Sequence, residues 1–486
     1  MTGGPLFRVD LVRRANWPPF ATCLAFGAVY LLALALMTIA WLSFIARCSG
    51  RTRGPAIPAG RILLFGLLVH GLALAVPPMM SDDVLAYAAI GRSMQHYGQP
   101  ASQPLGQSLP TDDPFRQAIE QYPNWLKAGS AYATGFNVIA RGVAAVAGDD
   151  LRMALLLFQA VGLVAVVLTA LATSRAARDW TLATVSADLT PTEADEAGRR
   201  AGTAALALVL FSPMTILEAT SNAHNDSLLA LCVALFAWAV AARHGGLGIA
   251  ALAGTWLVKA SGMLLLGFEL TRLVVSPLRA WLLARRRLLA TGAVACGVLG
   301  VAVAVGPARP ILNRQSSTIA SLLGSPDDKM PYCTRSLESA PRAILHIVLK
   351  QPRAAWLVGL VFRAAAVALL VYLAVRAEPG IERLTWAGTF VFLYYMYLHA
   401  HSQPWYLLAL LPLVPMADER LRPAMLAAMV SNLASYSVAF SWNGTTDVLV
   451  AGVFEVVSGL VVLIPPSVVL VRSLRAGSPQ PRSAAT

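Results

Sequence analysis

The sequence predicts an all-α, polytopic membrane protein: a helical bundle of about 11 to 13 transmembrane helices that forms a single integral membrane domain over residues 1–486. Two features of the composition lead to this fold class, since 57% of the residues are hydrophobic and only 13% are charged. A soluble chain of this length would need far more polar surface. The apolar residues lie in membrane-length runs without strict two-residue alternation, which argues against a β-barrel.

The expected spans are rich in Leu, Ala and Val, and a helix in lipid satisfies its own backbone polar groups. In chain order they cover residues 20–46, 62–78, 151–174, 201–217, 227–242, 247–275, 288–306, 354–375, 384–398, 405–416, 424–440 and 448–471. The first is too long for the apolar part of a signal peptide and should be retained. Span 247–275 is interrupted by Lys259, so we expect a bent hairpin of two short helices, or a re-entrant segment. A weaker segment at 131–148 should enter the membrane without crossing it.

Arginine is concentrated in alternate connections between these spans, and the positive-inside rule places those connections on the cytoplasmic side. The intervening segments 79–130, 218–226, 307–352, 399–404 and 441–447 then face outward. We take 79–150 as the first outer loop with its interfacial helices, and 307–352 as the second. The net charge of +13 therefore reflects membrane topology, and we expect no nucleic-acid partner.

Two adjacent carboxylates, Asp82 and Asp83, open the first outer loop. Apolar residues then recur every three or four positions, which predicts an amphipathic helix at the membrane surface. These residues are Val84, Tyr87, Ile90, Met94 and Tyr97. Helix capping would explain one Asp at such an N-terminus, but it explains a pair of adjacent Asp residues less well. A carboxylate at this boundary is also suited to take a proton from a sugar hydroxyl, so both are catalytic candidates.

A second polar cluster lies in a predicted outer turn. It consists of Glu218 and the segment Ser221, Asn222, Ala223, His224, Asn225 and Asp226. Capping of the next helix requires only Asn225 or Asp226. The remaining polar side chains of this turn therefore favour a binding site.

The third candidate is Lys259, which interrupts an apolar run. An ionisable residue at membrane depth is costly and is a functional candidate by default. The structural alternative is a hairpin tip whose Lys extends to the interface. An ammonium at the outer end of the hairpin could bind a lipid phosphate.

The fourth cluster lies late in the chain and consists of His399, His401, Gln403, Trp405 and Tyr406. Two His two residues apart are a weak metal signal without a third ligand, so we predict no metal site. Trp and Tyr at a membrane boundary are typical of the aromatic belt. Contact with a sugar or a lipid phosphate is the alternative, because aromatic faces stack on sugars.

Four phrases in this order resemble the GT-C superfamily of membrane glycosyltransferases, and within it the bacterial polyprenol-phosphate-mannose-dependent α-1,6-mannosyltransferases. The first is an acidic residue followed by Tyr and Gly-Arg, here Asp83, Tyr87, Gly91 and Arg92. The others are an A-H-N-D phrase at 223–226, a Lys in an apolar run at Lys259, and a late P-W-Y-L phrase at 404–407. The similarity covers roughly residues 60–420.

The resemblance implies a GT-C-like enzyme that transfers a hexose, expected to be mannose, from a polyprenyl phosphate to a glycan or lipid-linked acceptor. It implies action at the outer face of the bacterial inner membrane, among membrane lipids, by an inverting single displacement. Asp82 or Asp83 would be the base, and Lys259, Arg92 or His224 would stabilise the leaving phosphate. The residues expected to bind the donor are Arg92, His224, Asn225, Asp226 and Lys259; further sugar or lipid contacts are expected from Tyr87, Glu218, His399, His401, Gln403, Trp405 and Tyr406. No cofactor is indicated, and a divalent metal is compatible with this chemistry without being required.

The chain departs from the family at two places. Gly98–Ala101 replaces a common D-P-Y phrase, and Tyr132–Phe136 replaces a common Y-G-P-L phrase, which leaves the acceptor open. A secondary transporter or flippase is the main alternative, although such proteins seldom need a long outer loop with paired carboxylates. An O-antigen-ligase-type enzyme would instead use the 307–352 loop, and a structural membrane protein would have no use for four polar clusters.

Overall fold

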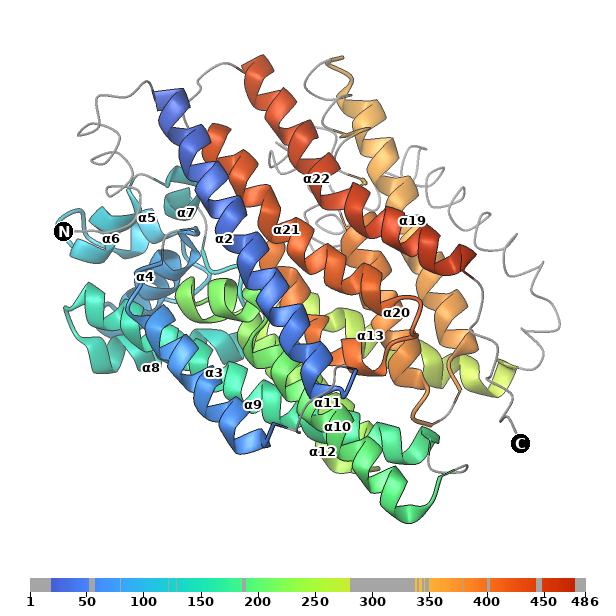
Figure 1. The fold of residues 1–486 in the computed structure, drawn as a ribbon. Helices are drawn as coiled ribbons and strands as arrows, with labels where there is room; N and C mark the ends of the chain where they lie inside the picture. The colour runs from blue at the N-terminus through green and yellow to red at the C-terminus, as the bar shows by residue number, and fades with distance from the viewer. Residues whose placement is uncertain are drawn as a thin grey trace. The chain divides into compact units, whose positions relative to one another are not determined.

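The computed structural model describes residues 19–51, 57–78, 80–120, 122–127, 129–185, 189–279, 337–338, 341–342, 345, 349–378, 380–399, 403–442 and 448–476 (Figure 1). Every regular element in these ranges is a helix, which confirms the all-α fold. The expected span 288–306, most of the 307–352 loop and His401 lie outside the described residues.

Several helices are long and apolar enough to cross a membrane, which confirms a multi-pass membrane protein. In the described part of the chain they are Ala25–Cys48, Leu151–Thr184, Ala260–Leu278, Arg353–Arg376 and Val456–Arg475. A sixth span is formed if the bent pair Pro191–Leu210 and Thr215–Ser221 counts as one crossing. Shorter apolar helices lie at Ala59–Leu74, Thr134–Ala147, Asp226–Ala241 and Gly245–Val258. The total of 11 to 13 crossings stays a prediction.

The chain divides into two compact units. The first is built chiefly from Leu32–Leu266 and Pro404–Met416, and the second from Cys23–Leu31, Gly267–Gln403 and Ala417–Thr486. The second unit includes α19 (Pro352–Arg376), α20 (Arg383–Leu393), the π-helix η6 (Tyr394–Leu398), α21 (Arg422–Trp442) and α22 (Val448–Arg475), and α21 packs along α22. The first unit contains most of the predicted site residues and is described below.

Two expected spans of the first unit are not regular α-helices. The expected helix 201–217 begins earlier, as α10 (Pro191–Leu210), and then bends by 58° into the π-helix η2 (Thr215–Ser221). Pro213 lies in the break, where it cannot donate a backbone hydrogen bond. The expected span 405–416 consists of two short 3-10 helices, η7 (Pro404–Ala409) and η8 (Leu411–Met416), with Pro415 inside the second. Backbone irregularity of this kind is typical of functional sites.

The outer-loop helix α4 (Asp83–His96) is buried on more sides than its amphipathic pattern predicts. Val84, Tyr87 and Ile90 are buried as expected, but so are the small residues between them. Gly91 explains the close approach of α8 (Thr134–Ala147), because a Cβ at this position would lie 2.2 Å from the Ala140 carbonyl oxygen. The short helices α5 (Leu105–Ser108), α6 (Pro114–Ile119) and α7 (Pro123–Lys127) complete this outer segment. The amphipathic helix is therefore embedded in protein.

The π-helix η2 is held from two sides. On α3 (Ala59–Leu74), the buried ring of His70 contacts Thr220 Oγ1 at 2.8 Å through Nδ1 and the Leu210 carbonyl oxygen at 2.9 Å through Nε2. On α9 (Leu151–Val185), Gly162 lets the Ala219 backbone approach, since a Cβ there would lie 2.0 Å from its carbonyl oxygen. This region of the chain is therefore rigidly positioned for the polar side chains that it carries.

Candidate functional site

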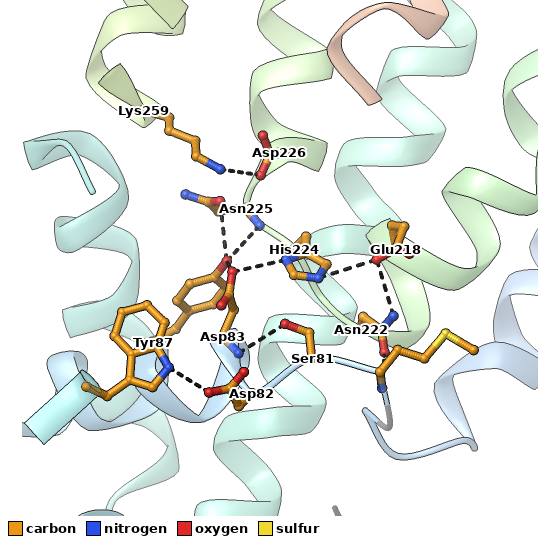
Figure 2. A network of polar contacts seen from close by, with 12 residues as sticks. Ser81, Asp82, Asp83, Tyr87, Glu218, Asn222, His224, Asn225, Asp226 and Lys259 are labelled. Atoms are coloured by element: carbon orange, nitrogen blue, oxygen red, sulfur yellow. Dashed lines mark hydrogen bonds and ion pairs between the residues drawn. The ribbon is translucent and has the colours of Figure 1, made fainter. Parts of the chain in front are cut away.

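The first two site residues lie at the start of α4, and neither acts as a helix cap. Asp82 occupies the N-cap position without a side-chain cap hydrogen bond, and its carboxylate instead accepts a 2.8 Å hydrogen bond from Trp125 Nε1. The Asp83 backbone N–H donates to Ser81 Oγ at 3.2 Å, and the Asp83 carboxylate points toward Tyr87 and His224 (Figure 2). The capping explanation considered for these carboxylates is therefore wrong in this structure.

Asp82 and Asp83 differ in their surroundings. Burial raises the pKa of Asp82, the adjacent charge of Asp83 raises it further, and the Trp125 hydrogen bond partly opposes both effects. The Asp83 side chain is 15% exposed, and its Oδ2 lies 3.5 Å from the Tyr87 hydroxyl and 3.4 Å from His224 Nδ1. Asp83 therefore faces the polar cluster, whereas Asp82 faces the aromatic side chain of α7.

The turn between η2 and α11 (Asp226–Ala241) brings the second cluster to Asp83. Ala223 has a φ of 57°, and this left-handed residue reverses the chain just before His224. His224 Nε2 then lies 3.4 Å from Glu218 Oε2, and Asn222 Nδ2 donates to the same oxygen at 3.3 Å. Figure 2 shows His224 between the carboxylates of Asp83 and Glu218. Asn225, the N-cap residue of α11, makes no side-chain cap hydrogen bond.

Lys259 joins the same cluster from the end of α12 (Gly245–Val258). The residue is extended, with φ of −156°, and a single 3-10 turn at Ala260–Gly262 separates it from α13 (Met263–Val275). This break confirms that the 247–275 run is interrupted at Lys259. Its Nζ lies 2.7 Å from Asp226 Oδ2 (Figure 2) and 4.4 Å from the centre of the Tyr406 ring. The Lys259 side chain does not extend away from the protein, because only 12% of it is exposed.

The late aromatic phrase contributes Trp405 and Tyr406 to this cluster. The Trp405 ring stacks on the His224 ring at 3.9 Å between centroids, with 13° between the planes. Tyr406 contacts the Lys259 ammonium as described above. Both aromatic residues of η7 thus lie against ionisable groups of the cluster, which goes beyond the aromatic-belt explanation.

The centre of the cluster is inaccessible to water in this structure but incompletely hydrogen-bonded. Glu218, His224 and Asp226 are 0% exposed and Asn225 is 2% exposed. Within the described residues, Asn225 Nδ2 and Asp226 Oδ1 have no hydrogen-bond partner. A buried unpaired donor or acceptor costs about 1–3 kcal/mol. An orphaned amide donor and carboxylate acceptor beside Lys259 are suited to bind a polyhydroxylated or phosphorylated ligand.

Tyr87 connects α4 to the start of α11. Its hydroxyl lies 3.3 Å from Asn225 Oδ1 as well as 3.5 Å from Asp83, and it can donate to one of them at a time. The ring packs edge-on against Tyr132, Phe136 and Phe158. Burial and the neighbouring charge of Asp83 raise its pKa well above the ordinary value, so the hydroxyl stays a neutral donor.

One predicted site residue of the first unit, Arg92, is not part of the cluster. Arg92 lies nine residues beyond Asp83 on α4, and its guanidinium pairs with Asp113 at 3.0 Å and with Asp149. Its charge therefore stabilises the outer segment and is not directed at the cluster. His399 and Gln403 belong to the second unit, where the His399 ring stacks on Tyr395 at 5.7 Å.

Sequence reasoning missed Trp125 and His70. Trp125 is a lone indole in the polar outer loop, and its position gave no sign that it would meet Asp82. His70 is a single His in an apolar span, which is a recognisable signal for a buried polar contact. Among the described residues, no group of three His, Cys, Asp or Glu side chains is placed to hold a metal ion.

Comparison with known families agrees with the resemblance seen in the sequence motifs. Residues 9–275 match the family model of the MptA_B family, described as alpha-(1->6)-mannopyranosyltransferase, N-terminal domain. No curated protein and no solved structure matches the chain. The family match includes Asp82, Asp83, Glu218, His224 and Lys259, and it supports a mannosyltransferase over the transporter alternative. Since the match covers more than half of the chain, the protein belongs to the MptA_B family of α-(1→6)-mannopyranosyltransferases and is a multi-pass membrane glycosyltransferase.

Proposed function

We propose that the protein is a GT-C-type enzyme that transfers mannose from a polyprenyl-phosphate mannose to a glycan or lipid-linked acceptor at the outer face of the bacterial inner membrane. Mannosyl transfer follows from the family. The donor and the outer face are supported by the positions of Asp83 and Lys259, which lie at predicted outer ends of apolar segments. The distribution of arginine supports the same orientation.

Asp83 is the base in this proposal. Of the two adjacent carboxylates, it is the one that faces His224 and the Asp226–Lys259 pair, whereas Asp82 accepts a hydrogen bond from Trp125. The Asp83 carboxylate takes the proton of the acceptor hydroxyl while the acceptor oxygen bonds to the anomeric carbon. The bond from that carbon to the phosphate oxygen breaks on the opposite side, which inverts the configuration. A base of this kind contributes about 10²–10⁴-fold to the rate.

Lys259 stabilises the phosphate that leaves. Its ammonium has three donors, and Asp226 Oδ2 takes one of them, so donors remain for phosphate oxygens. Arg92 is paired elsewhere, and both ring nitrogens of His224 face carboxylates of the protein, so neither side chain is suited to the same task. Asn225 Nδ2 and Asp226 Oδ1 lack partners among the described residues, and we assign them to hydroxyl groups of the donor sugar once it enters the cluster. Lys259 alone can neutralise part of the developing charge, so the proposal requires no metal.

The single observation that carries the proposal is the convergence of Asp83, His224, Asp226 and Lys259 in one buried cluster, although the first and last are far apart in the chain. The test uses membranes that contain the Asp83→Asn or Asp82→Asn variant, with radiolabelled polyprenyl-phosphate mannose and a short α-(1→6)-mannoside. Asp83→Asn should lower transfer about 10²–10⁴-fold. The exposed Asp112→Asn variant serves as the matched control and should transfer normally. Full activity of correctly inserted Asp83→Asn protein would refute Asp83 as the base.

A further inference from the structure

Each ring nitrogen of His224 faces a carboxylate, although neither makes a hydrogen bond within the described residues. Its Nδ1 lies 3.4 Å from Asp83 Oδ2, and its Nε2 lies 3.4 Å from Glu218 Oε2. The His224 and Glu218 side chains are both 0% exposed, and Trp405 stacks on the ring face. The imidazole therefore lies between two carboxylates, as Figure 2 shows. An imidazole that lies between two carboxylates is placed to pass a proton from one to the other.

Glu218 has no task in the transfer step proposed above, although it is fully buried. It lies in the π-helix η2, which His70 and the close approach at Gly162 hold in place. A buried carboxylate is costly unless it is paired or protonated. Glu218 lies beyond His224, on the side away from Asp83, and can therefore accept a proton that His224 passes on.

We propose that His224 and Glu218 form a proton relay behind Asp83, which clears the base after each mannosyl transfer. This inference rests on the proposed role of Asp83. Before the reaction, His224 is neutral, with its proton on Nε2 facing Glu218 and the lone pair of Nδ1 facing Asp83. Asp83 receives the proton of the acceptor hydroxyl and passes it to Nδ1. The Nε2 proton moves to Glu218, which restores the Asp83 carboxylate and leaves Glu218 protonated.

The protons balance over one turnover. One proton leaves the acceptor, one bond forms at the anomeric carbon, and the electron pair of the broken bond departs on the phosphate oxygen. After the product leaves, Glu218 returns one proton through His224 and Asp83 to water. Asp83 is therefore the catalytic residue, whereas His224 and Glu218 are positioning residues that move its proton.

His224 is surrounded by several ionisable groups. Asp83 from α4 and Glu218 from η2 contact the ring, and Asp82 and Asp226 interact with it electrostatically. Tyr87 and Lys259 belong to the same cluster through Asn225 and Asp226. Carboxylates outnumber cations in this set, so the cluster is suited to store a proton. Strongly interacting groups lose their protons as a set, so the acid limb of a pH–rate profile belongs to the cluster and not to one residue.

The deciding experiment compares Glu218→Asp with Glu218→Gln. Gln matches Glu in shape but cannot accept the proton, whereas Asp keeps the carboxylate and is one methylene shorter. The relay predicts that kcat falls about 10- to 100-fold in Glu218→Gln, that Glu218→Asp keeps the higher kcat of the two, and that the donor KM is unchanged in both. A role in packing alone predicts the opposite order, because the shape-matched Gln would then be the better replacement. That order, or wild-type kcat in Glu218→Gln, overturns the relay.

A second measurement tests His224 itself. Imidazole, 4-methylimidazole and 1,2,4-triazole are added to the His224→Ala variant, and the recovered kcat is compared with the pKa of each azole. The relay predicts recovery that increases with azole basicity, whereas recovery independent of azole pKa overturns it. Asp83→Asn should gain nothing from the azoles. If Asp83→Asn is instead fully active, the proposed function fails, and the two failures are thereby distinguished.

Discussion

Removal of the Lys259 ammonium should affect stability and activity by separable amounts. In the Lys259→Met variant, Asp226 loses the partner that lies 2.7 Å from its Oδ2. Asp226 is 0% exposed, and its Oδ1 already lacks a hydrogen-bond partner among the described residues. Breaking a buried pair on one side costs about 3–5 kcal/mol. The variant should therefore unfold at a clearly lower temperature and should also lose the cation that we assign to the leaving phosphate.

The double variant Asp226→Asn/Lys259→Met separates the two effects. It removes both charges, and replacement of a buried pair by neutral side chains is often neutral or even stabilising. Most of the lost stability should therefore return, whereas mannosyl transfer should stay absent. The assay combines thermal unfolding in detergent with transfer from radiolabelled polyprenyl-phosphate mannose in the same preparations.

Two results would refute this reasoning. If the double variant unfolds as early as Lys259→Met, the uncompensated Asp226 carboxylate is not the cause of the instability. If the folded double variant transfers mannose at the wild-type rate, Lys259 does not stabilise the leaving group. Lys259→Arg is the matched control, because it keeps the charge beside Asp226 and should unfold closer to the wild-type temperature.

Three further predictions concern the outer segment around α4. Arg92→Met should destabilise the protein by about 3–5 kcal/mol, because it leaves the buried Asp113 carboxylate without its ion-pair partner. Mannosyl transfer per folded molecule should stay near wild type. A variant that loses transfer without losing stability would contradict this assignment. Burial alone would raise the pKa of Asp113, but hydrogen bonds from Tyr97 and Arg92 outweigh burial and hold the pKa below its ordinary value. Asp113 therefore stabilises the folded protein at pH values above its pKa in the unfolded chain, which is about 4, and this stabilisation is lost as the pH falls through its lower pKa in the folded protein. The melting temperature should therefore fall less steeply with decreasing pH in Asp113→Asn than in wild type. Gly91→Ala should lower the melting temperature, because its Cβ would meet the Ala140 carbonyl oxygen at 2.2 Å, whereas Gly142→Ala, which meets no atom within 4 Å, should not.

The fold class and the membrane character could be predicted from the sequence because they depend on local composition. Apolar runs of membrane length form helices in lipid whatever their neighbours are. The interruption at Lys259 was visible for the same reason, since a charge inside such a run is costly. The helix type within each apolar run was less predictable. Residues 405–416 form two 3-10 helices, and the 201–217 span bends into a π-helix.

The candidate site was predictable as a set of residue types but not as an arrangement. The motifs pointed to Asp82, Asp83, His224, Asp226 and Lys259, and all five lie in or beside the one cluster. The same motifs made Arg92 equivalent to Lys259, because both were cations in family phrases. Only the packing of α4 against α6 and α8 shows that Arg92 is paired with Asp113 and Asp149 at the other end of its helix.

The sequence by itself determined the membrane architecture, the family and the residue types available for the reaction. These depend on hydrophobic run length, arginine distribution and short motifs, all of which are properties of neighbouring residues. The tertiary structure decided which groups touch: Asp83 with His224, His224 with Glu218, and Asp226 with Lys259. Two of these contacts join segments far apart in the chain, and the third depends on the turn after η2, so their distances depend on how α4, η2, α11 and α12 pack. No local periodicity encodes that packing, so the contacts around His224 became visible only in the folded protein.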